Sequence, residues 1–195
     1  MLMSSGSSQS GLHPAIEKIL GRSSTKKFAD TPVTRAQLEL LLTAAVRAPD
    51  HGLLAPWRFT VLEGDRRTLL GDAMSAALRE KSPDADRELL DREASKAMRS
   101  PTLVVVSAVS QAHPKVPEIE QWVAVGAAIQ NLWIAAESLG LGVAWKTGSH
   151  AYSPSVKKTL GLAPCECIIG FIHLGTPVTK GPLRTADIES RTRWL

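Results

Sequence analysis

Apolar residues recur at helical spacing between Thr34 and Pro49. They are Leu38, Leu41, Leu42 and Ala45. Thr34 suits the N-cap and Pro49 ends the pattern, so a helix is predicted between them. A shorter helix is predicted to begin at Pro14, because proline suits a first helical turn, and to end near Gly21. The polar and basic residues 22–28 that separate these helices predict a loop.

Four segments have the apolar patterns of β-strands. Residues 57–63 alternate between apolar and polar side chains, which is typical of a strand with one buried face. Residues 103–109 form an apolar, largely β-branched run, which is typical of a strand buried on both faces. Residues 167–174 predict a last buried strand, and residues 143–145 predict a short one.

The remaining segments have helical patterns. Two polar helices are predicted over residues 66–99, with a break near Ser82 and Pro83. Residues 117–139 are apolar nearly all round, so this helix is expected to lie in a core or in a subunit interface. One more helix is predicted over residues 153–161. Helices interleaved with strands in this way predict an α+β sandwich.

Composition indicates a globular chain. Of its 195 residues, 44% are hydrophobic and 22% are charged, values that exclude a disordered or fibrous protein. No linker or repeat is visible, so residues 13–195 are predicted to form one domain. Residues 1–12 are rich in Ser and Gly without the pattern of a signal peptide, and they predict a disordered leader. The apolar stretch 122–136 is shorter than the ~20 residues of a membrane helix, so no membrane partner is expected.

The charge balance narrows the choice of partners. Lys and Arg number 23 against 19 Asp and Glu, a formal net charge of +4. The basic residues are spread along the chain, which disfavours nucleic acid and is compatible with a phosphate-bearing ligand. Cys165 and Cys167 are too close in sequence to pair easily and lack the second pair of a zinc site. They are interpreted as small apolar residues, which fits a reducing, cytoplasmic location.

Motifs for catalysis by side chains are missing. Ser149 precedes His150, but neighbours in sequence do not have nucleophile–base geometry, and there is no G-x-S-x-G motif. The histidines are scattered, so no metal site is predicted. Residues 139–142 read Leu-Gly-Leu-Gly between a helix and a strand, which is the reverse of the dinucleotide-binding order. They are interpreted as a helix C-cap.

Two segments are candidates for binding an anion. In residues 22–28, Arg22 offers a planar fork of donors that matches phosphate, and hydroxyls and lysines follow it. A solvated basic turn explains the same pattern equally well. In residues 47–51, Arg47 and His51 are four residues apart and could address a ligand. Arg47 could equally interact with the carbonyls at the end of its own helix.

Taken together, the ordered motifs resemble the nitroreductase family of flavoproteins, in particular its compact YdjA-like branch. The motifs are residues 22–28, 47–51, 56–59, 113–117, 120–121, 130–131, 139–142, 145–148 and 170–177. The resemblance covers about His13 to Pro177. It implies an α-β-α sandwich with a mixed central sheet, assembled as a homodimer. It also implies an FMN-dependent NAD(P)H oxidoreductase, a nitroreductase, with a flavin site shared across the interface.

The resemblance also implies roles for residues. Those implied to bind FMN are Arg22, Ser23 and Ser24 near its phosphate and ribityl chain, Arg47 and His51 from the partner chain, and Trp145, Lys146 and Thr147 along its ring. Those implied to contact NAD(P) are Ala135, Ala136, Glu137, Ser138, Leu139 and Gly140. No catalytic side chain is implied, because FMN carries the hydride between NADH or NADPH and the acceptor in a ping-pong cycle. Nitroaromatics and quinones are the implied acceptors.

Some positions depart from the family pattern. Ser23 stands where a second Arg is usual, so phosphate affinity is expected to fall unless Lys26 or Lys180 compensates for the lost charge. Leu53 and Ala55 make their loop more apolar, and the tail from Pro182 also differs. These departures keep two alternatives open: a non-catalytic FMN-binding or partner-binding protein, and an enzyme of the family with another flavin-dependent redox substrate.

Overall fold

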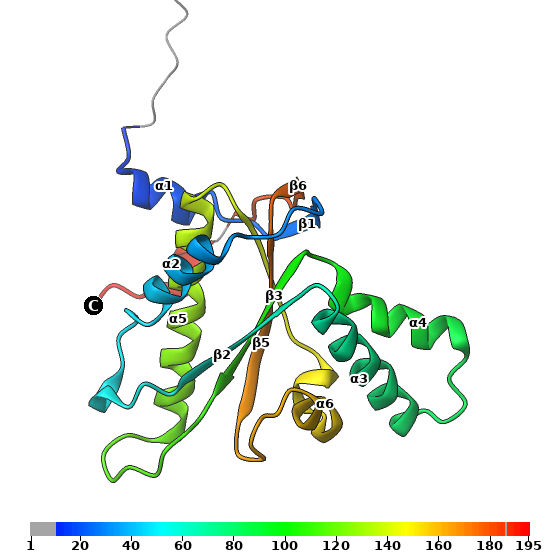
Figure 1. Ribbon diagram of the computed structural model, residues 1–195. Coiled ribbons are helices and arrows are strands. Elements are labelled where there is room, and N and C mark those ends of the chain that lie inside the picture. The colour runs from blue at the N-terminus through cyan, green and yellow to red at the C-terminus, as the bar shows by residue number, and fades with distance from the viewer. Residues whose placement is uncertain (1–10, 186) are drawn as a thin grey trace, which may run out of the picture.

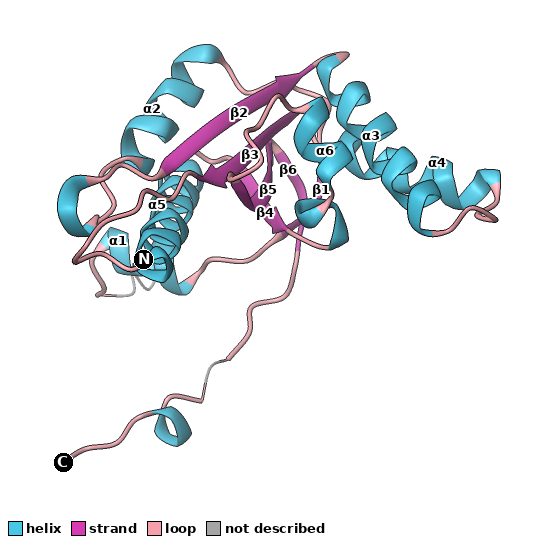
Figure 2. Ribbon diagram, turned by 90° about the horizontal axis from the view of Figure 1, so that it is seen from below, coloured by secondary structure: helices cyan, strands magenta, loops and turns pink. Residues whose placement is uncertain are grey.

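The computed structural model describes residues 11–185 and 187–195. Residues 1–10 of the predicted leader therefore lie outside the described residues. In the described part, helices cover both faces of a central sheet, so the chain forms an α-β-α sandwich as predicted (Figures 1 and 2). None of the helices in these residues is long and apolar enough to cross a membrane.

The central sheet has the strand order β2-β3-β5-β4. Its strands are β2 (Trp57–Glu63), β3 (Thr102–Ala108), β5 (Cys167–Gly175) and β4 (Gly142–Lys146). The predicted strands are thus confirmed, with bounds that differ by one residue in β3, β4 and β5. β3 is buried at every residue, as its continuous apolar run predicted.

The sheet is antiparallel at every described pairing, so the mixed sheet implied by the resemblance is not present within this chain. The connections give the reason. A hairpin of two helices, α3 (Arg66–Lys81) and α4 (Arg87–Ser95), returns the chain beside β2 in the opposite direction. β3 and β4 run parallel to each other, but β5 lies between them and pairs antiparallel with both.

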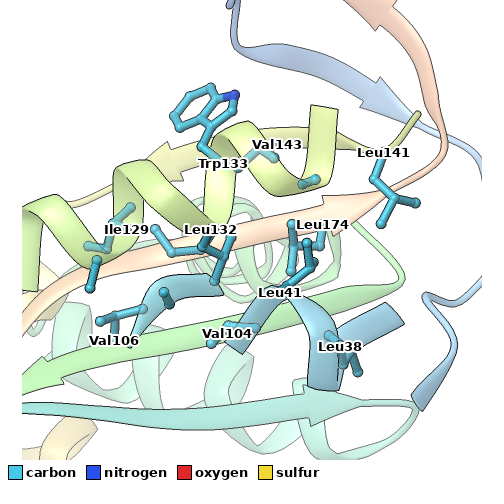
Figure 3. Close-up of a cluster of buried hydrophobic side chains, with 14 of the residues drawn as sticks. Leu38, Leu41, Val104, Val106, Ile129, Leu132, Trp133, Leu141, Val143 and Leu174 are labelled. Atoms are coloured by element: carbon cyan, nitrogen blue, oxygen red, sulfur yellow. The ribbon is translucent and has the colours of Figure 1, made fainter. Parts of the chain in front are cut away.

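One face of the sheet is covered by α2 (Arg35–Ala45) and α5 (Glu118–Ser138), with the short α1 (Pro14–Leu20) beyond them (Figure 1). A capping box fixes the start of α2: Thr34 Oγ1 accepts from the Gln37 amide, and Gln37 Oε1 accepts from the Thr34 amide. The core between these helices and the sheet includes Leu41, Val104 and Leu132, which are fully buried (Figure 3).

The other face is covered by α3 and α6 (Pro154–Thr159), with α4 packed on α3 and short 3-10 turns at Lys96–Met98 and Ser149–Tyr152 (Figure 2). The predicted break between the two polar helices is confirmed. Leu70, Leu103 and Phe171 are among the residues of this second core, each 2% exposed or less. The two cores pack against opposite faces of the sheet, and β4, which carries predicted site residues, lies at its edge.

A second, two-stranded sheet was not predicted. β1 (Thr25–Phe28) pairs antiparallel with β6 (Pro177–Lys180), so half of the predicted loop at residues 22–28 is a strand. The polar sequence of β1 does not indicate a strand, because this strand is stabilised by a partner that lies about 150 residues away in the chain. Gly142 permits the close packing beneath it: a Cβ at this position would lie 2.4 Å from Thr25 Oγ1.

The predicted long apolar helix is only partly covered. In α5, Ile129 and Leu132 are fully buried, whereas Ile119 and Val123 are 61% and 64% exposed. Leu40 of α2 is 53% exposed. Beyond β6 the chain continues to a short 3-10 turn at Glu189–Arg191 and an exposed C-terminus.

Candidate functional site

The predicted phosphate-binding segment lines a hollow of about 320 Å³. The hollow is lined by Arg22, Ser23, Ser24, Lys26, Gly181, Pro182 and Arg184. The pairing of β1 with β6 brings the two segments together, and the Gly181 amide donates to the Ser24 carbonyl at 2.7 Å. Arg22, Lys26 and Arg184 supply three cations, and no carboxylate is among the described lining residues. Such a hollow favours a phosphate or another polyanion.

Arg22 is held against α5. Its Cζ lies 4.7 Å from the centroid of the Trp133 ring, a cation–π contact. Trp133 is 4% exposed, and its Nε1 is buried without a hydrogen-bond partner, as is Thr25 Oγ1. Ser23 is 5% exposed. The hollow thus combines a fixed guanidinium with a buried serine beside it.

Lys180 does not supply the expected compensating charge at Ser23. Its Nζ contacts Glu137 Oε2 at 2.5 Å, and the Glu137 side chain is 7% exposed. The lysine charge is neutralised by a buried carboxylate, because an isolated carboxylate would be costly there. Arg184, which lines the hollow itself, is the cation that stands near Ser23 instead. In the sequence, the only signal for Arg184 was its place in a basic tail.

The residues predicted to contact NAD(P) are divided by the end of α5. Ala136 is fully buried, and Glu137 is buried in its pair with Lys180. Ser138, the last residue of α5, and Leu139 and Gly140 after it are exposed, whereas Ala135 is partly buried. Of these six predicted residues, Ser138, Leu139 and Gly140 are exposed to a ligand, and their NAD(P) contact stays a prediction.

Arg47 and His51 lie in a separate region at the end of α2. Arg47 lines a second hollow, of about 370 Å³, together with Asp50, Leu53 and Trp57. His51 is exposed in a 3-10 turn (His51–Leu53), and its Nδ1 lies 2.6 Å from Glu120 Oε2. The turn therefore contacts the first turn of α5.

The backbone of this turn is strained where the sequence departs from the family pattern. Leu53 has φ 55° and Ala55 has φ 46°, a region that side chains other than Gly rarely adopt. Asp50 Oδ2 stabilises the conformation by accepting from the Ala55 amide at 2.6 Å. Leu53 is 89% exposed, so an apolar side chain is held out into solvent.

Trp145, Lys146 and Thr147 lie at the end of the edge strand β4. The Trp145 indole packs on its own sheet: its Nε1 donates to the Ile169 carbonyl at 3.1 Å. Lys146 and Thr147 are exposed and line a third hollow, of about 290 Å³. The predicted flavin-binding residues of the single chain are therefore divided among three hollows, and His51 and Trp145 line none of these three.

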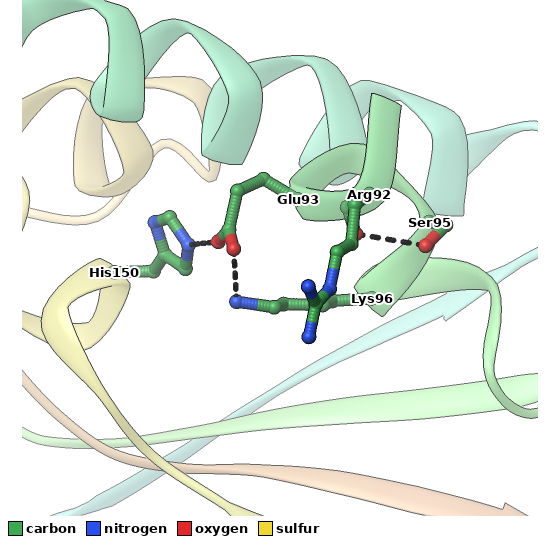
Figure 4. A network of polar contacts seen from close by, with 5 residues as sticks. All are labelled: Arg92, Glu93, Ser95, Lys96 and His150. Atoms are coloured by element: carbon green, nitrogen blue, oxygen red, sulfur yellow. Dashed lines mark hydrogen bonds and ion pairs between the residues drawn. The ribbon is translucent and has the colours of Figure 1, made fainter. Parts of the chain in front are cut away.

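The third hollow was not predicted from the sequence. Besides Lys146 and Thr147 it is lined by Met74, Lys96, Ala97, Arg99, Leu103, Gly148, Ser149, His150, Phe171 and His173. Behind it, Glu93 contacts both His150 Nε2, at 2.6 Å, and Lys96 Nζ (Figure 4). Burial raises the pKa of Glu93, but the hydrogen bonds from Lys96 and His150 outweigh it and leave this pKa below its usual value.

His173 is a neutral histidine in the same wall. Burial, followed by the charges of Arg99 and Lys146, lowers its pKa to about 4. Ser100 Oγ donates to the Thr102 carbonyl, so it accepts from His173 Nδ1 at 2.9 Å. The ring therefore carries its proton on Nδ1. Within the described residues, no group of three or more His, Cys, Asp or Glu side chains could hold a metal ion.

Comparison with known proteins shows the family of this chain. The profile of the nitroreductase family matches residues 19–176. The chain belongs to the nitroreductase family. YdjA of Escherichia coli (strain K12), named as an NAD(P)H nitroreductase, is 34% identical over 168 residues, which cover 85% of this chain and 90% of YdjA. The family predicted from the ordered motifs is thus confirmed.

Solved structures agree on the fold. The nitroreductase-like family protein from Bacillus cereus aligns with a TM-score of 0.80 at 24% identity, over 96% of this chain and 99% of that one. The FMN- and NADPH-dependent nitroreductase NfnB from a Sphigopyxis strain aligns with a TM-score of 0.78 at 19% identity, over 94% and 99%. The predicted nitroreductase-like α+β fold is confirmed.

Proposed function

We propose that the protein is an FMN-dependent NAD(P)H oxidoreductase that reduces nitroaromatic or quinone acceptors in a ping-pong cycle. The observation that carries the proposal is the hollow of Arg22, Lys26 and Arg184 in a chain of the nitroreductase family. The name of YdjA, and the FMN complex named for a related structure from Desulfovibrio desulfuricans (TM-score 0.74), point to the same cofactor and electron donor.

The residues of the hollow fit the phosphate end of FMN. Three cations face a volume of about 320 Å³, which accommodates a phosphate with part of a ribityl chain. Ser23 and Ser24 add hydroxyl donors, and none of the described lining residues is a carboxylate that would repel a dianion. The buried Thr25 Oγ1 without a partner is a further polar atom of this segment.

FMN, when bound, supplies the hydride chemistry, so the protein needs no acid–base pair of its own. The chain's residues then have three tasks. Arg22, fixed on Trp133, holds the phosphate. The backbone after β4, at Lys146 and Thr147, lies at the free edge of the sheet, where an amide can orient a planar ring. Arg47 would add positive charge beside the ring from the partner chain.

A homodimer accounts for the separation of the predicted site residues. Ile119 and Val123 of α5, Leu40 of α2 and Leu53 of the strained turn are all more than half exposed. α5 contacts both α2 and this turn, so these exposed residues lie on neighbouring elements (Figure 1). A second copy covering this face would bury them and bring its Arg47 and His51 toward the hollow of the first chain.

Two measurements test the function separately. FMN binding is measured by titration of the cofactor-free protein, and turnover by NADH or NADPH oxidation with nitrobenzene or menadione as acceptor. Tight binding with turnover supports the proposal. Binding without turnover against any acceptor would favour a non-catalytic flavin-binding protein. Turnover only with other acceptors would favour another redox substrate, and no FMN binding would refute the proposal.

A further inference from the structure

The turn that follows β4 lies beyond the end of the strand pairing. Residues 147–153, called the β4 turn, follow Lys146, whose pairing with Phe171 ends the ladder between β4 and β5. Residues 147–149 are exposed, and Gly148 has φ 121°, a region that residues other than Gly rarely adopt. The proposed function places Thr147 of this turn along the flavin ring. The β4 turn therefore needs contacts outside the sheet to fix its conformation.

Two buried residues attach the β4 turn to the rest of the molecule. The side chain of His150 is 10% exposed, and its Nε2 lies 2.6 Å from Glu93 Oε2 (Figure 4). Ala151 is buried in the second core, and its amide donates to the Gly148 carbonyl at 3.1 Å. The Ser153 amide donates to the His150 carbonyl at 3.2 Å. The position of His150 therefore decides where the exposed part of the turn lies.

Glu93 is an ionised acceptor with two donors. Its side chain is 13% exposed and contacts both His150 and Lys96. The pKa of Glu93 lies below its usual value, so this carboxylate is ionised at neutral pH. An ionised carboxylate only accepts, so His150 carries a proton on Nε2 and donates it to Glu93. A hydrogen bond to a charged acceptor with little exposure to water is a strong link between α4 and the β4 turn.

Glu93 is itself held by the close packing of α4 on α3. A Cβ at Gly71 of α3 would lie 2.6 Å from the carbonyl oxygen of Ala94, the residue that follows Glu93. The two helices therefore approach closely beside Glu93, and this approach fixes the backbone from which its side chain extends. A continuous set of contacts runs from α3 through Glu93 and His150 to the β4 turn.

We propose that Glu93 is a positioning residue, which through His150 holds the backbone at Thr147 in the conformation that it presents to the flavin ring. Glu93 is not among the described residues that line the hollow at this turn, so it acts through its neighbours. The phosphate end of FMN is proposed to bind elsewhere, at Arg22. Loss of Glu93 should therefore disturb the orientation of the ring more than the affinity for FMN. The role toward the flavin rests on the proposed function, whereas the hold on the β4 turn does not.

Hydrogen exchange of the cofactor-free protein, followed by NMR, tests the hold on the β4 turn. Glu93→Ala is expected to speed exchange of the Ala151 and Ser153 amides at least fivefold and to leave α5 unchanged. Glu88→Ala removes an exposed carboxylate from the same helix outside the network and is the matched control. Equal exchange in Glu93→Ala and Glu88→Ala would overturn the inference.

A second variant separates the hydrogen bond from the charge. Glu93→Gln removes the same charge as Glu93→Ala but keeps an oxygen that accepts from His150. Its exchange in the β4 turn should therefore stay within twofold of the native protein. Equal effects in the Gln and Ala variants would assign the effect to charge and overturn the inference. If Glu93→Ala does not fold in a thermal melt, His150→Leu breaks the same contact from the other side and takes its place.

The FMN-loaded protein tests the role toward the flavin. FMN affinity is measured by titration, and the rate of flavin reduction by NADH or NADPH is measured by stopped flow. Glu93→Ala should slow reduction at least tenfold while FMN affinity stays within threefold, and Glu93→Gln should recover most of the rate. Losses of rate and affinity in equal proportion would show a merely structural role and refute the positioning.

The two measurements also separate this inference from the proposed function. If the native protein binds no FMN, the proposed function fails and the role toward the flavin fails with it, while hydrogen exchange still decides the hold on the β4 turn. If the native protein turns over and Glu93→Ala reduces its flavin at the same rate, the proposed function stands and the inference fails.

Discussion

The guanidinium of Arg22 lies over the indole of Trp133, 4.7 Å from the ring centroid. This contact joins the loop before β1 to the long helix α5, although the two residues are far apart in sequence. It places a fixed positive charge at the hollow shared with Lys26 and Arg184. The proposed phosphate site therefore depends on the core of the sandwich and not on the loop alone.

The first prediction concerns Arg22 itself. Arg22→Ala should weaken FMN binding about tenfold or more, because a charged hydrogen bond to phosphate is worth about 1.5–3 kcal/mol. Fluorescence titration of the cofactor-free protein measures the effect. Lys27→Ala removes a neighbouring exposed cation that does not line the hollow, and should leave the affinity nearly unchanged. An unaltered affinity in Arg22→Ala would remove this residue from the site.

The second prediction concerns Trp133. Trp133→Leu should weaken FMN binding by roughly twofold to tenfold, because the guanidinium loses the ring that orients it. Trp133→Phe keeps an aromatic face and should lose less. The same titration measures both variants, with thermal melts to confirm that each is folded. Equal affinities in the Leu and Phe variants would show that the ring does not orient Arg22.

The third prediction concerns packing beneath β4. A Cβ at Gly170 would lie 2.2 Å from Trp145 Nε1, so Gly170→Ala should destabilise the protein by about 1–3 kcal/mol. Urea unfolding measures the loss. In a Trp145→Ala background the same substitution should cost much less, because the clashing indole is gone. An equal cost in both backgrounds would place the strain elsewhere.

The fourth prediction concerns pH. The pKa of His173 is about 4 in the folded chain and near 6.5 when unfolded, so the unfolded state binds more protons between these values. Its contribution to stability is therefore complete above pH 6.5 and is lost as the pH falls toward 4, by up to about 3 kcal/mol. Urea midpoints for the native protein and His173→Gln should converge over this window. A constant difference between pH 7 and pH 4.5 would contradict the assigned pKa.

The fifth prediction concerns assembly. Val123→Asp should convert the proposed dimer to monomers, because Val123 is 64% exposed on the face that a second copy is proposed to cover, and a charge there would have to be buried. Sedimentation at micromolar concentration measures the change. Leu69→Asp alters an apolar residue of α3 that is 60% exposed on the other side of the sheet, and should leave the dimer intact. A native protein that sediments as a flavin-loaded monomer would refute the shared site.

Local signals in the sequence were sufficient for most elements. Thr34 begins its helix with the expected cap, and the alternating residues 57–63 form the strand with the predicted bounds. Both signals depend on a few neighbouring residues, so they can be read from the sequence without knowing the rest of the structure. The β1–β6 pair was missed because each strand is short and polar and is stabilised only by the other.

The site was predicted unevenly for the same reason. Arg22 lies in a recognisable motif, whereas Arg184 and Arg99 do not. Arg184 and Arg99 line their hollows only because the fold brings distant segments together. Lys180 seemed a free cation in the sequence but pairs with Glu137, which the helical pattern had placed in the core. Sequence spacing cannot reveal such pairs between distant elements, because burial decides which charges remain available.

The most direct test of the central claim is the visible absorption spectrum of the purified protein after incubation with FMN and removal of excess cofactor. We predict a bound flavin spectrum with a stoichiometry near one per chain, bleached by NADH or NADPH in the absence of oxygen and restored by an acceptor. A colourless protein that cannot be loaded with FMN would contradict the account.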